Sequence, residues 1–116
     1  MSFNLRKYND QISRSQLCSF TFNNHHTTDL FVKRDDLIHP EVSGNKWRKL
    51  KWNLIGALQN KCNVISTYGG AYSNHLLATA SLGYDFGIQT RAYIRGDELN
   101  QSSNALLKRC HDLNMD

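Results

Sequence analysis

The sequence predicts an α/β protein in which an N-terminal β-hairpin is followed by a helix and then by βαβα units of a parallel sheet. Two short runs rich in aromatic and β-branched residues flank a polar segment near the N-terminus, which is typical of a hairpin. Further along, two apolar runs alternate with segments of helical period, which is the pattern of right-handed βαβ crossovers. The chain of 116 residues suffices for one globular domain or for part of a larger one.

Residues 1–18 show no clear hydrophobic period and are expected to form an arm. The hairpin strands are predicted at 20–22 and 30–34, with a polar turn between them. That turn contains the adjacent His25 and His26, which could bind a metal ion, but no third ligand stands at a recognisable spacing. A solvated turn without a metal is therefore favoured.

The segment 35–40 follows the hairpin and is predicted to be a loop, which the only proline of the chain stops. Its neighbouring carboxylates, Asp35 and Asp36, could serve as general acids. Hydrogen bonds that fix a turn or cap a helix are a more common role for such residues, and this structural role is favoured.

A helix is predicted over residues 45–60. Ser43, Gly44 and Asn45 prefer the non-helical positions just before a helix and mark its start. On a helical wheel the apolar side chains that follow fall within about 100° and form a stripe that can pack on a core. The members of this stripe are Trp47, Leu50, Leu54, Ala57 and Leu58.

Lys46 lies in the first turn of this helix, at the edge of the apolar stripe. The positive end of the helix dipole and desolvation both favour an uncharged amine at that place. An uncharged amine is a nucleophile that can form an imine with a carbonyl group. The alternative is that Lys46 extends along the surface and keeps its charge in water, as most lysines do.

Two strands and two helices are predicted in the second half of the chain. An apolar run at 63–68 predicts a buried strand, and a glycine-rich turn at 69–75 leads into a helix that Gly83 should cap. The next strand is predicted at 87–94, and the last helix at about 101–114. Inward-facing side chains are predicted to be Leu76, Leu77 and Ala80 in the first helix, Ile88, Thr90, Ala92 and Ile94 in the strand, and Leu106, Cys110 and Leu113 in the last helix.

The sheet predicted from these elements is unfinished. The last helix has no strand to return to, and no C-cap signal precedes Asp116. Parallel sheets need both faces covered, so two parallel strands rarely stand alone. Residues 19–116 are therefore expected to be the first part of a larger domain.

Charge and cysteine content narrow the function classes. The net charge of +4 suggests a nucleic-acid partner, but the basic residues of 45–60 point all round the helix and form no groove-facing stripe. No apolar run approaches the roughly 18 residues that span a membrane, and the N-terminus lacks the apolar region of a signal peptide. The three cysteines are odd in number and widely spaced, which indicates reduced thiols. We expect a cytoplasmic protein that binds neither nucleic acid nor membranes.

The glycine-rich turn is a candidate ligand site, because it follows the carboxyl end of a predicted parallel strand. Gly69 and Gly70 let a ligand approach the backbone, and the N–H groups of the next helix can hold a phosphate or a carboxylate. Ser73 adds a hydroxyl group and Asn74 an amide. The residues match neither a P-loop, nor a dinucleotide fingerprint, nor a nucleophile elbow. Simple capping of the helix by Ser73 is the alternative.

Three motifs taken together carry more information than any one of them alone. They are Lys-Arg-Asp-Asp-Leu at 33–37, Ser-Gly-Asn-Lys-Trp-Arg-Lys-Leu at 43–50 and Gly-Gly-Ala-Tyr-Ser-Asn-His at 69–75. In this combination the chain resembles the pyridoxal-phosphate enzymes of the tryptophan-synthase β-subunit fold. It is most similar to the branch that holds 1-aminocyclopropane-1-carboxylate deaminase and D-cysteine desulfhydrase. The resemblance covers about residues 17–116 and implies an incomplete part of that fold.

The resemblance also implies roles for individual residues. Lys46 would form the covalent bond with the aldehyde of pyridoxal 5′-phosphate, and Asn74 would contact the pyridine oxygen and the substrate. Ser73 and nearby N–H groups would hold the substrate carboxylate, and in the deaminases this serine also helps to activate the substrate. Lys49 matches a second lysine of the motif and joins Lys46 and Ser73 as a catalytic candidate. His75 is expected to be structural.

The function implied is that of a pyridoxal-phosphate-dependent deaminase or lyase that acts on a small amino acid. In relatives of this fold the phosphate-binding loop and the group facing the pyridine nitrogen lie beyond the residues matched here. The 116-residue chain alone is therefore expected to be inactive, and the full-length protein could be a homo-oligomer. The alternatives are a non-catalytic remnant or interaction module and, less favoured, a basic nucleic-acid-binding domain.

Overall fold

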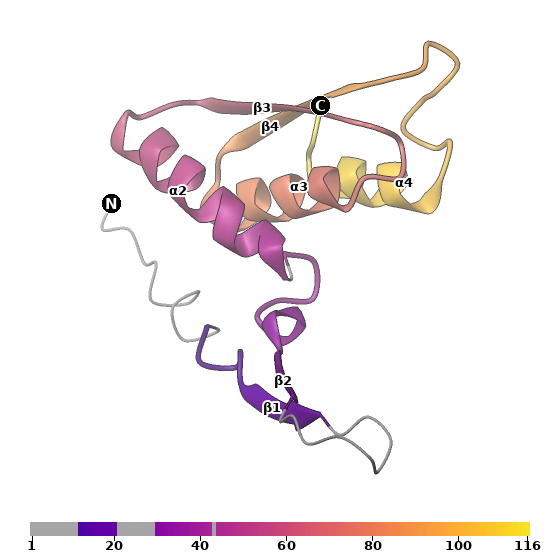
Figure 1. The fold of residues 1–116 in the computed structure, drawn as a ribbon. Helices are drawn as coiled ribbons and strands as arrows, with labels where there is room; N and C mark the ends of the chain where they lie inside the picture. The colour runs from indigo at the N-terminus through magenta and orange to yellow at the C-terminus, as the bar shows by residue number, and fades with distance from the viewer. Residues whose placement is uncertain (1–11, 21–29, 43) are drawn as a thin grey trace.

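The computed structural model describes residues 12–20, 30–42 and 44–116. Its strands and helices alternate in the second half of the chain, as the sequence predicts. The elements are the strands β1 (Leu17–Phe20), β2 (Leu30–Lys33), β3 (Val64–Gly69) and β4 (Gln89–Ile94), the 3₁₀ helix η1 (Asp35–Leu37), and the helices α2 (Asn45–Gln59), α3 (Asn74–Phe86) and α4 (Ala105–Asp112). The hairpin β1–β2 projects from one end of the molecule, and η1 links it to α2 (Figure 1).

The predicted hairpin is confirmed, but its first strand begins earlier than expected. β1 pairs antiparallel with β2, with Leu17 opposite Lys33 and Phe20 opposite Leu30. Leu17 and Cys18 therefore belong to the hairpin and not to the arm assigned to 1–18. The rest of that arm up to residue 11 and the turn with His25 and His26 lie outside the described residues.

The parallel sheet is also confirmed, and it continues past the last helix. β3 pairs parallel with β4, from Val64 opposite Gln89 to Gly69 opposite Ile94. At the other edge of β4, Met115 forms a parallel bridge with Thr90, and the backbone N–H of Ala92 donates to Asp116. As predicted, no strand follows the last helix among the described residues, but residues 115–116 begin to pair beside β4.

Helices cover only one face of the β3–β4 pair among the described residues (Figure 1). On the covered face Thr67 and Thr90 are buried. On the open face Tyr68 is 76% exposed, and its ring stacks on Tyr93 with centroids 5.0 Å apart. The prediction that β3 is a buried strand is therefore wrong for its outward face. An apolar run cannot by itself distinguish a strand covered on both sides from one covered on a single side.

The core forms two clusters, one beneath α2 and one between α3, β4 and α4. The stripe predicted on α2 is confirmed, since Trp47 and Leu54 are almost fully buried. In α4 the pattern missed Leu107, which is buried where Leu106 was expected. The first cluster contains Ile38, Val42, Trp47, Leu50, Leu54, Ala78, Leu82 and Ile88. The second contains Ala71, Leu76, Ala80, Leu107, Cys110, Leu113 and Met115.

Two helix ends differ from the prediction. Gly83 lies inside α3, and the C-cap is Gly87, whose φ of 67° is in the left-handed region that glycine adopts without strain. A Cβ atom on Gly83 would lie 2.3 Å from Thr90 Cγ2, so close packing of α3 on β4 explains this glycine. The last helix begins only after Asn104, whose side chain accepts a hydrogen bond of 2.8 Å from Leu107 N–H. Among the described residues, no helix is long and apolar enough to cross a membrane.

Candidate functional site

The turn between β3 and α3 lies at the carboxyl end of the parallel strands. A hydrogen bond of 3.0 Å from Ser73 N–H to the carbonyl oxygen of Gly70 holds the turn together. Ser73 is the N-cap of α3, and its Oγ accepts a hydrogen bond of 3.3 Å from His75 N–H. The capping role considered for Ser73 is therefore confirmed. A capping hydroxyl still has its own hydrogen to donate, so this role leaves it able to bind a carboxylate.

Gly69 and Gly70 differ in what surrounds them. A Cβ atom on Gly69 would lie 2.9 Å from Leu76 Cδ2, so the packing of α3 requires a glycine there. A Cβ atom on Gly70 would meet nothing within 4 Å. Gly70 leaves open space beside the backbone. Only this second glycine leaves room for a ligand to approach.

Lys46 lies in the first turn of α2 and is half-buried. Its Nζ donates a hydrogen bond of 3.1 Å to Asn45 Oδ1. Lys49 follows one turn later and is exposed. The N-cap is Gly44, with φ of 61°, while the predicted cap residue Ser43 lies outside the described residues. The placement of Lys46 at the edge of the apolar stripe agrees with the prediction.

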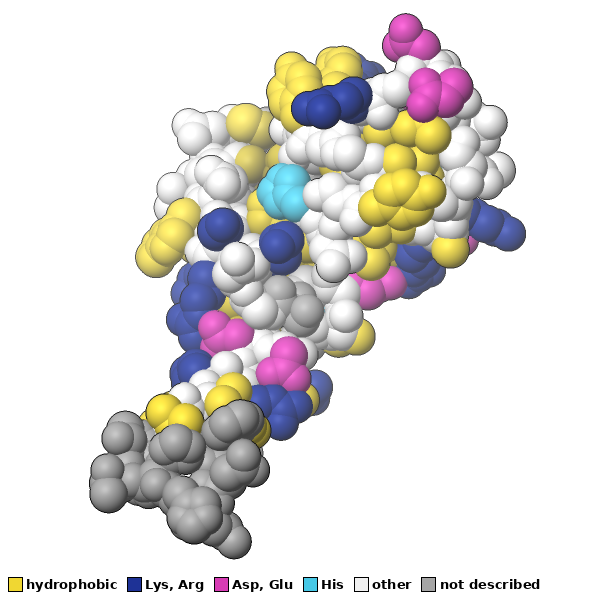
Figure 2. Space-filling model, turned by 45° about the vertical axis from the view of Figure 1, so that its right-hand side comes forward, with side chains coloured by type: hydrophobic (Ala, Val, Ile, Leu, Met, Phe, Trp, Pro, Cys, Tyr) yellow, Lys and Arg dark blue, Asp and Glu magenta, His cyan; other side chains and the backbone are white. Residues whose placement is uncertain are grey.

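His75 lies in the first turn of α3 and contacts β3. Its Nε2 lies 2.8 Å from Thr67 Oγ1 on β3. Burial lowers the pKa of His75, and the positive charges of Lys46 and Lys49 lower it further. The two lysines therefore lie close enough to α3 for their charges to act on its first turn. Figure 2 shows a histidine with basic side chains beside it on one face of the molecule.

A hollow of about 450 Å³ lies at the same end of the parallel strands. Its edge is closed by a hydrogen bond of 3.3 Å from Arg95 N–H to the carbonyl oxygen of Gly69. Aromatic rings and a guanidinium group border it. The lining residues are Tyr68, Gly69, Gly70, Tyr93, Ile94 and Arg95. Its size falls within the range of about 300–1,000 Å³ that is common for small-molecule sites.

Asp35 and Asp36 have the structural roles that the sequence favours. Asp35 accepts hydrogen bonds from Arg48 on α2 and from Ser15, and these bonds hold the pKa of its carboxyl group far below the ordinary value. Its backbone oxygen also accepts from Gly44 N–H at 2.9 Å. Asp36 pairs with Arg34 at 2.7 Å. These contacts show that Asp35 anchors the start of α2, a link that sequence spacing did not reveal.

The residues of the two predicted turns lie at the starts of α2 and α3. Lys46 supplies an amine, and the first turn of α3 supplies the hydroxyl group of Ser73, the amide of Asn74 and backbone N–H groups. An amine can react with an aldehyde, and a helix N-terminus favours an anion. The arrangement suits a ligand that carries a carbonyl carbon and a negatively charged group.

The chain is similar to several curated proteins. It is 38% identical over 80 residues to a provisionally named 1-aminocyclopropane-1-carboxylate deaminase of Pyrococcus abyssi, which covers 69% of this chain and 24% of the relative. It is 36% identical over 72 residues to the mitochondrial bifunctional D-cysteine desulfhydrase/1-aminocyclopropane-1-carboxylate deaminase of Arabidopsis thaliana, covering 62% of this chain and 18% of the relative. A D-cysteine desulfhydrase of Serratia proteamaculans is 31% identical over 78 residues, which are 67% of this chain and 24% of the relative.

These relatives confirm the resemblance that the three motifs indicate. The chain spans only about a quarter of the length of the curated relatives it matches. No family model matches the chain. No solved structure matches it either. The observed hairpin and parallel strand pair agree with part of an α/β enzyme of this kind.

Proposed function

We propose that this chain, a homologue of 1-aminocyclopropane-1-carboxylate deaminases and D-cysteine desulfhydrases, takes part in pyridoxal-phosphate-dependent deaminase or lyase chemistry on a small amino acid. One observation carries the proposal beyond the names of the relatives. Lys46 lies in the first turn of α2, and its positive charge adds to burial in lowering the pKa of His75, in the first turn of α3. This charge effect supports the proposal that the amine of Lys46 and the N-terminus of α3, which could bind an anion, act together at the carboxyl edge of the parallel sheet.

The residues present fit part of the cofactor. The amine of Lys46 suits its aldehyde, and the amide of Asn74 suits the oxygen on its pyridine ring. The open side of Gly70 gives the ring system room to approach the backbone. When bound, pyridoxal phosphate supplies an electron sink that stabilises negative charge on the substrate carbon. The groups for its phosphate and its ring nitrogen are proposed to come from segments outside these 116 residues.

Lys46 has two tasks in this proposal. Its amine would hold the cofactor through the aldehyde. As a neutral amine it would also accept the proton from the substrate carbon as a general base. Its half-buried place in the first turn of α2 keeps it near the reacting atoms. The charge of Lys49, one turn later, attracts an anionic cofactor or substrate to the same edge.

Ser73 and Asn74 orient the substrate. The Ser73 hydroxyl group accepts from His75 N–H and can donate its own hydrogen to the substrate carboxylate. The first N–H groups of α3 point in the same direction and favour a negative charge. A fixed carboxylate places the reacting carbon relative to Lys46, and such positioning lowers the entropic part of the barrier.

A non-catalytic interaction module is the second candidate function. The observation that favours it is the exposed apolar surface of the hairpin, where Leu17 is 63% exposed and Phe31 59% exposed. Such side chains are typical of surfaces that contact another chain or another part of the same protein. A homo-oligomer of the full-length protein would also use surfaces of this kind.

Borohydride trapping tests the proposed function. The chain is incubated with pyridoxal phosphate, reduced, digested and mapped by mass spectrometry. We expect more pyridoxyl label on Lys46 than on Lys49, although Lys49 is the more exposed of the two. Lys46→Arg is the control, and it should lose this label while the far-ultraviolet circular dichroism stays the same. Label distributed according to exposure over Lys49 and Lys61 would contradict the assignment.

Turnover is a separate measurement. We expect the 116-residue chain to release neither ammonia nor sulfide from small amino acids above the level of Lys46→Arg. Without groups for the phosphate and the ring nitrogen, little would orient the ring relative to Lys46. Release by the unmodified chain that the variant lacks would show that the reaction needs only these residues.

A further inference from the structure

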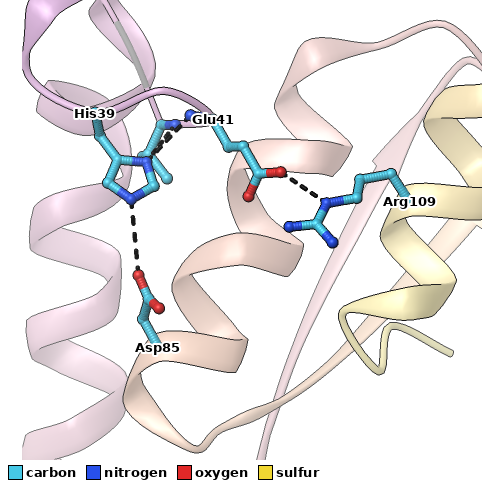
Figure 3. A network of polar contacts seen from close by, with 5 residues as sticks. His39, Glu41, Asp85 and Arg109 are labelled. Atoms are coloured by element: carbon cyan, nitrogen blue, oxygen red, sulfur yellow. Dashed lines mark hydrogen bonds and ion pairs between the residues drawn. The ribbon is translucent and has the colours of Figure 1, made fainter.

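His39 is bound through both nitrogens of its ring (Figure 3). Its Nδ1 accepts hydrogen bonds from the backbone N–H groups of Glu41, at 3.1 Å, and Val42, at 3.0 Å. On the other side of the ring, Nε2 lies 3.8 Å from Asp85 Oδ2 on α3. The side chain is only 12% exposed. None of the roles proposed above uses this residue.

The two backbone bonds fix the tautomer of His39. A nitrogen that accepts two N–H donors carries no hydrogen of its own, so the neutral ring has its hydrogen on Nε2. That hydrogen faces the carboxylate of Asp85. The ring therefore connects the loop before α2 to the side of α3.

The loop that His39 binds leads directly to α2. Val42 is fully buried and packs in the same core cluster as Ile38 and Trp47. A backbone N–H next to such a side chain needs a hydrogen-bond partner, because leaving it unsatisfied away from water is costly. Nδ1 of His39 provides that partner for the N–H of Val42, which lies four residues before Lys46. Residues 39–42 precede Gly44, the N-cap of α2, in the chain.

A second contact holds the same loop. Glu41 Oε1 accepts a hydrogen bond of 2.7 Å from Arg109 Nε on α4 (Figure 3). Burial acts to raise the pKa of Glu41, but hydrogen bonds from Arg109 and Ser81 outweigh burial and lower it. Glu41 is therefore a carboxylate at neutral pH. The loop is tied to α3 through Asp85 and to α4 through Arg109.

We propose that His39 is a positioning residue for Lys46. Its neutral ring holds the N–H groups of Glu41 and Val42, and this fixes the turn from which α2 presents the lysine. Because Lys46 is assigned under the proposed function, the inference rests on that function. Protonation of Nδ1 would put a hydrogen where two N–H donors converge, so both bonds would break. The carboxylate of Asp85 faces the ring, and the carboxylate of Glu41, which points to Arg109, acts on it through its charge. Both favour the charged form of the ring, while Arg109 neutralises part of that effect. Acidification should thus release the turn.

Two variants separate the functions of the two ring nitrogens. The amide of asparagine lies near the position of Nδ1, so His39→Asn keeps an acceptor for the loop. The longer glutamine reaches the position of Nε2, so His39→Gln keeps the contact with Asp85 and loses the acceptor. Neither side chain titrates. Comparing them at neutral pH and on acidification distinguishes hydrogen bonding to the loop from general packing.

Amide hydrogen exchange measures the loop directly. At neutral pH we expect exchange at Glu41 and Val42 to be about tenfold faster in His39→Gln, since each lost bond contributes roughly 0.5–1.5 kcal/mol. In His39→Asn it should stay within about twofold of the unmodified chain. The amides of Thr90 and Ala92 on β4 are the control. Equal loss of β4 protection in both variants would assign His39 to overall stability and overturn the proposal.

The position of Lys46 is measured by its reactivity towards a small acylating reagent, relative to Lys49 on the same helix. Between pH 8 and pH 5.5 we expect this ratio to change in the unmodified chain and to stay constant in His39→Asn. A ratio that follows pH equally in both would overturn the inference. Borohydride trapping is scored separately. If Lys46 takes no pyridoxyl label but its ratio depends on His39, the proposed function fails and the positioning stands. If it takes the label and the ratio ignores His39, only this inference fails.

Discussion

The starts of α2 and α3 are held in different ways. α3 begins with a local cap, because Ser73 accepts from His75 N–H two residues later. α2 begins at Gly44, which has no side chain, and its start is held by distant residues. Asp35 binds both Gly44 N–H and the Arg48 side chain, and His39 binds the preceding loop. The start of the helix that carries Lys46 therefore depends on tertiary contacts, whereas the helix that carries Ser73 and Asn74 has a local cap in addition to the contact of His75 with Thr67.

This difference has a consequence for the candidate site. A local cap keeps its geometry as long as the helix exists. A start held by side chains from other segments moves when any one of those contacts is lost. Changes away from the site should thus disturb Lys46 more readily than they disturb Ser73. The four predictions below test this contrast.

The largest expected effect comes from Gly83→Ala, which disturbs the packing of α3 and leaves its cap intact. The added Cβ would lie 2.3 Å from Thr90 Cγ2 and 2.8 Å from the carbonyl oxygen of Ile88. Overpacking of this kind typically costs about 1–3 kcal/mol, and urea denaturation should show that loss. Gly56→Ala in α2 is the matched control, because nothing lies within 4 Å of its added Cβ. It should stabilise the chain by roughly 0.5–1 kcal/mol. Equal effects from the two would contradict the close contact between α3 and β4.

Asp35→Asn should loosen the start of α2 without affecting the cap of α3. It weakens the bonds from Arg48 and Ser15, so we expect a lower urea midpoint and a changed Lys46 to Lys49 reactivity ratio. The pKa of Asp35 is lowered from its ordinary value of 3.8, so its contribution is present above that pH and lost as pH falls below it. The variant should therefore lose less stability than the unmodified chain on acidification below about pH 4. Identical acid profiles would remove Asp35 from the anchor of α2.

Ser73→Ala tests the local cap. Loss of an N-cap hydroxyl costs about 0.5–2 kcal/mol, and the amide of His75 should lose protection against exchange. Ser73→Asn is the control, since asparagine caps helices as well as serine does and adds no charge. The reactivity ratio of Lys46 to Lys49 should stay unchanged in both variants. A changed ratio in Ser73→Ala would show that the two helix starts are not independently held.

The same contrast explains which features could be predicted from the sequence. The apolar stripe of α2, the alternation in β4 and the cap at Ser73 depend on residues close together in the chain, and their spacing predicts them correctly. The sequence predicts Gly83 as the C-cap of α3, but Gly87 has that role, because a glycine pattern does not reveal that Thr90 packs against Gly83.

The contacts of Asp35 and His39 lay beyond prediction for a related reason. Asp35 meets Ser15 and Arg48, which are 20 and 13 residues away, and His39 meets Asp85 on another helix. No local pattern encodes such separations. For the candidate site, Lys46 and Ser73 lie where the motifs predict, while their roles with a cofactor stay predictions.

The smallest expected effect tests whether the two helix starts face each other. Burial lowers the pKa of His75 from its ordinary value of 6.5, and the charges of Lys46 and Lys49 lower it further. Lys49→Gln removes one of these charges, so the pKa of His75 should rise, as measured by the NMR titration of its ring protons. Lys61→Gln is the control, because Lys61 is not among the charges that act on His75.

The sign of the accompanying stability change follows from the same pKa. Below about pH 6.5 the unfolded chain binds a proton that His75 in the folded chain resists, so folding loses stability as the pH falls. In Lys49→Gln the folded histidine resists that proton less, and the loss between pH 7 and pH 5 should be smaller than in the unmodified chain or in Lys61→Gln. Denaturant midpoints across this range provide the measurement. An equal loss of stability in all three proteins, together with an unchanged pKa of His75, would mean that Lys49 lies too far from α3 to act on it. That result would separate the start of α2 from the candidate site at the start of α3.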